Sequence, residues 1–128
     1  MFVHRIDPVI AEVRGVYLWW YGLSYALGFV ELHVWFRLQR RRLAMTMREV
    51  YDISILVPLC VLIGGRLVEV FFYEWPYYRV HPDWIPALWI GGMSTHGLLA
   101  GAAAGTAIFC ALHKRSFIRI ADELVIPA

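Results

Sequence analysis

The chain has 128 residues, of which 60% are hydrophobic and 16% are aromatic, and its formal net charge is +2. Soluble domains contain about 45–50% apolar residues, so this composition and a mean hydropathy of +0.57 indicate an integral membrane protein. The arginines flank apolar runs, a placement that does not favour nucleic-acid binding. The sequence contains no CxxC, GxGxxG, Walker or GxSxG motif, and it predicts neither a metal site nor a cofactor.

Three apolar stretches, residues 16–36, 53–73 and 94–112, have the length of membrane spans. A helix of about 20 residues rises about 30 Å, which matches the hydrocarbon thickness of a bilayer. The predicted fold class is therefore an all-α integral membrane protein with three transmembrane helices, in one incomplete membrane domain over 1–128. Its connecting parts are an N-terminal segment 1–15, a loop 37–52, an aromatic loop 74–93 and a tail 113–128.

The distribution of Lys and Arg predicts the orientation of these spans. Eight cations lie in the 37–52 loop and the C-terminal tail, whereas the N-terminal segment and the 74–93 loop hold three. The positive-inside rule therefore places the N-terminus and the aromatic loop outside, and the Arg-rich loop and the tail in the cytoplasm. Trp, Tyr and Pro residues in the 74–93 loop are typical of a membrane–water interface.

Glycines at positions 97, 101 and 105 repeat every four residues and share one face of the third span. Such small-residue faces let another helix approach closely. Cys60 and Cys110 lie inside apolar runs and are interpreted as buried thiols.

Three polar residues lie in the outer part of the predicted spans. At a rise of 1.5 Å per residue, Tyr21, Arg66 and His96 lie roughly 7, 10 and 4 Å below the outer interface. Arg66 and Glu69 are three residues apart and can pair, either as a structural pair or as part of a functional site. Glu31 and His33, near the other end of the first span, are interpreted as interfacial groups.

His96 lies in the first turn of the third span, with Ser94 as the predicted N-cap. The positive end of the helix dipole disfavours the imidazolium form, so a neutral imidazole that can accept a proton is expected. Two interpretations remain open from the residues alone, a catalytic base and an interfacial histidine that only hydrogen-bonds.

Five segments together resemble the phosphatidylglycerol–prolipoprotein diacylglyceryl transferases of bacterial cytoplasmic membranes. They read "IDPVI", "WYGLSYALGF", "GGRLVEVFFY", "GGMSTHGLLAG" and "SFIRIADELVIPA", and they cover nearly the whole chain in the family's order. The resemblance implies transfer of a diacylglyceryl group from phosphatidylglycerol to the lipobox cysteine of a prolipoprotein. It also implies that His96 is a catalytic histidine and Tyr21 an essential tyrosine near the lipid site, both expected to be catalytic. Arg66 occupies the family's arginine position, and its role stays open between a structural pair and a head-group contact. The predicted substrate-binding residues are Arg66, Gly97 and Ser94.

The sequence departs from the family pattern in three places. The family usually has His-Gly-Gly where this chain has His96-Gly97-Leu98, and an aromatic residue is common at the position of Glu69. A Gly-Arg-x-Gly-Asn-Phe signature in a later span of the family has no counterpart here, so activity is expected to require a C-terminal half. The alternatives are a non-catalytic module that pairs with a separate C-terminal half, and a small transporter or proton relay using Glu31, Arg66, Glu69 and His96.

Overall fold

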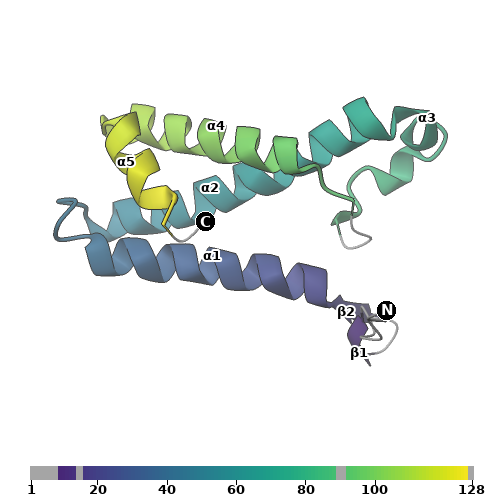
Figure 1. The fold of residues 1–128 in the computed structure, drawn as a ribbon, viewed down its shortest axis with the longest axis horizontal. Helices are drawn as coiled ribbons and strands as arrows, with labels where there is room; N and C mark the ends of the chain where they lie inside the picture. Colours follow the sequence, from purple (N-terminus) through teal and green to yellow (C-terminus); the bar gives the residue numbers. More distant parts are fainter. Residues whose placement is uncertain (1–8, 14–15, 89–91, 127–128) are drawn as a thin grey trace, which may run out of the picture.

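A computed structural model describes residues 9–13, 16–88 and 92–126 of the chain. Three long helices form the body of the molecule, and a short antiparallel hairpin precedes them (Figure 1). The elements, in chain order, are β1 (Val9–Val13), β2 (Val16–Trp19), α1 (Trp20–Gln39), α2 (Met47–Val68), the π-helix η1 (Glu69–Tyr73), α3 (Trp75–Tyr78), the 3-10 helix η2 (Pro82–Trp84), α4 (Thr95–His113) and α5 (Phe117–Leu124).

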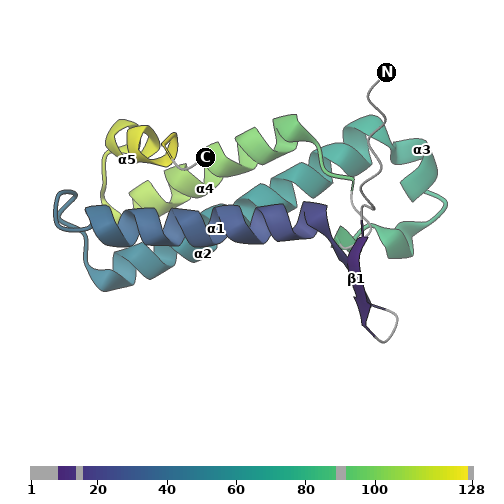
Figure 2. The same ribbon diagram turned by 60° about the horizontal axis from the view of Figure 1, so that its bottom comes forward.

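Helix α2 lies between α1 and α4, and it packs most extensively against α4 (Figures 1 and 2). The hairpin, α3 and the N-terminal ends of α1 and α4 gather at one end of the bundle. Helix α5 and the loop between α1 and α2 lie at the opposite end. We call these two ends the hairpin end and the α5 end.

The close packing of α2 on α4 depends on glycines. Gly97 and Gly101 are buried, and a β-carbon on either would overlap the backbone of α2, at Gly64 and Cys60 respectively. A β-carbon at Gly105 would lie 3.0 Å from the α-carbon of Val57. The predicted small-residue face is therefore confirmed, and its partner is α2.

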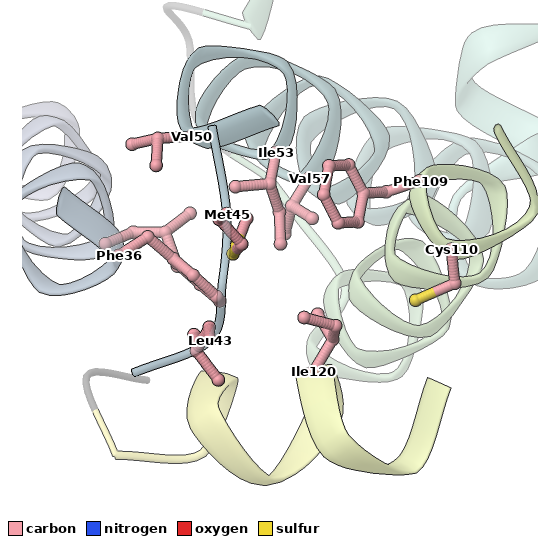
Figure 3. Close-up of a cluster of buried hydrophobic side chains, with 10 residues drawn as sticks. Phe36, Leu43, Met45, Val50, Ile53, Val57, Phe109, Cys110 and Ile120 are labelled. Atoms are coloured by element: carbon pink, nitrogen blue, oxygen red, sulfur yellow. The ribbon is translucent and has the colours of Figure 1, made fainter. Parts of the chain in front are cut away.

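The buried apolar core lies toward the α5 end (Figure 3). There Phe36 of α1, Val50 and Ile53 of α2 and Phe109 of α4 are fully buried, and Ile120 of α5 covers them. An Arg115–Glu49 ion pair of 2.6 Å and an Arg42–Glu123 pair reinforce the same end. At the hairpin end, Val70, Tyr78 and Ala87 are buried but lie outside this cluster.

The helices and strands do not begin and end at the predicted span boundaries. Residues 16–19, assigned to the first span, form a short strand that pairs with β1, so the helical bundle is preceded by a hairpin and α1 begins only at Trp20. Helix α2 begins at Met47, inside the predicted 37–52 loop, because Thr46 and Glu49 form a capping box. The predicted tail 113–128 contains α5, whose apolar and polar residues occupy opposite faces.

Within the described residues, two helices are long and apolar enough to cross a membrane, Met47–Tyr73 and Thr95–His113. Helix α1 is not one of them, because Glu31, His33 and Arg37 lower its hydropathy. Large apolar side chains nevertheless remain exposed along all three long helices, among them Leu27, Val30, Ile55 and Leu99. Such continuous apolar surface is unusual for a soluble monomer and suits a lipid environment.

Candidate functional site at the hairpin end

His96 occupies the first turn of α4 and is exposed. The turn is fixed by Ser94, whose hydroxyl accepts a hydrogen bond from the Gly97 amide at 3.4 Å. The Ser94 amide in turn donates to the Gly65 carbonyl of α2 at 3.0 Å. Ser94 is therefore the predicted N-cap, and it anchors the start of α4 to α2.

The imidazole of His96 contacts a residue that sequence reasoning did not single out. Its Nδ1 lies 3.1 Å from the hydroxyl oxygen of Tyr73, the last residue of the π-helix η1. A π-helix widens the turn and changes the direction of the side chains that follow it. No periodicity in the sequence marks this change, so the Tyr73–His96 contact could not have been predicted from spacing.

Arg66 is 4% exposed and holds the 74–93 loop against α2. Its Nε donates to the Ile85 carbonyl at 2.9 Å, and its two terminal nitrogens donate to the carbonyls of Gly92 at 2.9 Å and Trp84 at 2.6 Å. The guanidinium also lies 5.0 Å from the ring centroid of Tyr78, in cation–π range. One buried cation thus ties three points of the 74–93 loop to the end of α2.

Gly92 lies beside Arg66 and Glu69, the two charged residues whose spacing suggests a pair. A β-carbon at Gly92 would lie 3.5 Å from an Arg66 terminal nitrogen and 3.7 Å from Glu69 Oε1, and its φ of +75° suits glycine. Among the ion pairs of the described residues, none joins Arg66 to Glu69. The guanidinium donates to loop carbonyls instead.

Tyr21 lies in the first turn of α1 and is 42% exposed. Its hydroxyl is 3.1 Å from that of Tyr25, and the two rings meet edge to face at 4.9 Å. The N-terminal ends of α1 and α4 lie at the same end of the bundle (Figures 1 and 2), so Tyr21 and His96 are both at the hairpin end.

The remaining predicted site residue, Gly97, is buried where α4 crosses α2. Its described contacts are with α2 and with the Ser94 cap.

Glu31 is exposed, and His33 pairs across helices through Nδ1 with the Ser54 hydroxyl at 3.0 Å. Glu31 and His33 therefore belong to a different part of the bundle from His96.

A mostly apolar cavity of about 300 Å³ opens between α1, α2 and α4. Ser24, Tyr25 and Gly28 of α1 form one wall, and Val61 of α2 and Ala102 of α4 form another. Ser24 and Tyr25 lie one turn from Tyr21. Tyr21 itself does not line the cavity, whose lining also includes Leu124 of α5.

The chain matches the family model of prolipoprotein diacylglyceryl transferases over residues 8–128. Curated relatives named phosphatidylglycerol–prolipoprotein diacylglyceryl transferase also match, among them the following three. The Desulfotalea psychrophila relative is 38% identical over an alignment of 122 residues that covers 94% of this chain and 45% of the relative. The Azoarcus relative is 40% identical over 95% of this chain and 48% of its own length. The Escherichia coli O1:K1 relative is 38% identical over 92% of this chain and 41% of its own length. The chain spans about half the length of the curated relatives it matches.

Proposed function

Because the chain belongs to the prolipoprotein diacylglyceryl transferase family, we propose that it contributes to lipoprotein maturation. The reaction would transfer the diacylglyceryl group of phosphatidylglycerol to the lipobox cysteine thiol of a prolipoprotein. The observation that carries this proposal is the exposed His96 imidazole at the capped start of α4, beside Tyr73. Its described hydrogen bond uses Nδ1, and Nε2 is then the nitrogen presented to a substrate.

In the proposed step, the cysteine S–H proton passes to Nε2 of His96. The thiolate sulfur attacks the glyceryl carbon that bears the phosphate ester, and a C–S bond forms while the C–O bond breaks. The electron pair of that C–O bond stays on the phosphate oxygen, so glycerol phosphate leaves. A cysteine with a pKa of about 8.5 is mostly thiol at neutral pH, and a positioned base therefore accelerates this step.

Tyr21 is proposed to contact the lipid substrate, because it is partly exposed and lies one turn from Ser24 and Tyr25, which line the apolar cavity. Arg66 and Ser94 serve the site by positioning, since they fix the outer loop and the first turn of α4 to α2. Gly97 allows the close helix approach that this arrangement needs. The direct binding of substrate by Arg66, Ser94 and Gly97 stays a prediction.

We further propose that α1 is a third membrane-spanning helix and that the hairpin end faces outward from a bacterial cytoplasmic membrane. The loop before α2 and the tail after α4 carry most of the cations, as expected for cytoplasmic segments. Leu27, Val30 and Val34 of α1 expose an apolar surface that suits lipid contact. In this orientation, phosphatidylglycerol of the outer leaflet and an emerging prolipoprotein both reach His96.

The proposed function can be tested in a chimeric protein that has the full length of the relatives. Residues 1–128 are joined to the remaining C-terminal part of the Azoarcus relative, and thioether formation on a lipobox peptide is measured by mass spectrometry with phosphatidylglycerol. General base catalysis contributes about 10²–10⁴-fold, so His96→Gln is expected to lower the rate by that factor. The matched control is His81→Gln, which changes a histidine of the outer loop. Equal rates for the two variants would show that His96 is not the base.

A further inference from the structure

The hydrogen bond between Tyr73 and His96 has two chemically distinct forms. The distance of 3.1 Å joins the Tyr73 hydroxyl oxygen to Nδ1, and either atom can carry the shared proton. If the tyrosine donates, a neutral His96 carries its proton on Nε2. If the tyrosine oxygen accepts, Nδ1 carries the proton and Nε2 keeps its lone pair. Only the second form leaves Nε2 able to accept a proton.

The geometry points to Tyr73 as a positioning residue that holds His96 in the Nδ1–H tautomer, so that Nε2 acts as the base. This inference rests on the proposed function, which requires a proton acceptor on the ring. Tyr73 is 56% exposed, so its own O–H proton can be donated to water or to a lipid phosphate. The phenolic oxygen can then accept a hydrogen bond from Nδ1–H while its own proton is donated elsewhere.

The two side chains are held in place by separate features of the fold. The π-helix η1 ends at Tyr73, and the backbone amide of Glu74 caps it by donating to the Glu69 carbonyl at 3.0 Å. On the other side, the Ser94 cap fixes the turn that carries His96. The contact of Gly64 with Gly97 then holds the two helices at a fixed separation.

The same hydrogen bond suits the protonated state of His96. When Nε2 takes a proton, the Nδ1–H group keeps its acceptor, and the bond strengthens because the donor is now charged. No rearrangement of Tyr73 or His96 is needed between the two states. The tyrosine oxygen thus stabilises the imidazolium that the proposed step produces.

The test is the tautomer of His96 in this chain, measured in detergent micelles by ¹⁵N NMR of histidine-labelled protein at a pH where the imidazole is neutral. His96→Gln assigns the signals. Because proton-bearing and lone-pair nitrogens have well-separated ¹⁵N shifts, long-range ¹H–¹⁵N correlations identify the tautomer directly. The wild-type chain is expected to show Nδ1 as the proton-bearing nitrogen.

Tyr73→Phe removes only the hydroxyl group, and it is expected to shift His96 toward the Nε2–H form that free imidazole side chains prefer. Tyr77→Phe, in the same outer segment but packed on His81 and Trp84, is expected to leave the His96 signals unchanged. A wild-type Nε2–H tautomer would overturn the inference, and so would an Nδ1–H tautomer that persists in Tyr73→Phe. The measurement needs no catalysis, so its result is independent of whether His96→Gln inactivates the chimera.

Discussion

Gly64 and Gly97 face each other across the α2–α4 crossing so closely that a β-carbon on residue 97 would overlap the Gly64 carbonyl group. The obstacle on each side is backbone, which cannot move away as a flexible side chain can. The Gly64–Gly97 contact therefore sets the position of the start of α4, and of His96 on it, relative to α2.

This contact predicts that Gly97→Val destabilises the chain. Overpacking at a close backbone contact costs about 1–3 kcal/mol, so the free energy of unfolding in mixed micelles should fall by that amount. Unfolding is followed by circular dichroism as SDS is added. The matched control is Gly28→Val on α1, where a β-carbon would meet no atom within 4 Å. Equal losses in the two variants would contradict a specific role for the crossing.

The contacts of Arg66 predict that Arg66→Gln releases the 74–93 loop from α2. Each hydrogen bond from a charged group contributes about 1.5–3 kcal/mol, and three carbonyls of the loop lose their donor. Trypsin cleavage after Arg79 should therefore accelerate at least about tenfold, with the fragment identified by mass spectrometry. Arg48→Gln, at an exposed arginine, is the control and should leave this rate unchanged. An unaltered rate in Arg66→Gln would show that the loop is held by other contacts.

At the α5 end, Arg115 and Glu49 are expected to couple strongly. Glu49 Oε1 accepts from Arg115 Nε at 2.7 Å, and the arginine also donates to the carbonyls of Leu43 and Ala44. A double-mutant cycle with Arg115→Gln and Glu49→Gln should give a coupling energy of about 0.5–3 kcal/mol. The exposed Arg48–Asp52 pair, with its atoms 4.0 Å apart, should give no more than about 0.5 kcal/mol. The idea fails if the two couplings are equal.

The hydroxyls of Tyr21 and Tyr25 are hydrogen-bonded to each other, but removing one or the other should affect the reaction rate differently. Tyr21 is proposed to contact lipid, so Tyr21→Phe in the chimera should lower the rate of thioether formation by about tenfold or more, the effect of losing one hydrogen bond to a charged group. Tyr25→Phe removes the other hydroxyl of the same pair and should have a smaller effect. A larger loss in Tyr25→Phe would move the lipid contact to Tyr25.

Parts of this arrangement can be predicted from sequence because they depend on periodicity. The repeat of Gly97, Gly101 and Gly105 predicts a close helix contact, and the Ser94 cap is visible from residue type. The spacing of Thr46 and Glu49 is likewise that of a capping box, which marks the start of α2. The apolar run begins only at residue 53, because the first turn of α2 carries charged residues.

Other parts depend on backbone groups that carry no sequence signal. Spacing placed Arg66 and Glu69 on one face, yet the guanidinium donates to the carbonyls of a loop that folds back over it. Every residue has a carbonyl, so no residue type marks those acceptors. The π-helix that brings Tyr73 to His96 is likewise a local change of backbone hydrogen bonding, and periodicity alone does not reveal it.

The account requires that the His96 end of α4 faces outward. In a chain with Cys60→Ala and Cys110→Ala, Thr95→Cys places one thiol next to His96, and Lys114→Cys places one at the other end of α4. A membrane-impermeant maleimide added to intact spheroplasts is expected to label position 95 at once and position 114 only after permeabilisation. Labelling of position 114 in intact spheroplasts, with position 95 protected until permeabilisation, would contradict the proposed site.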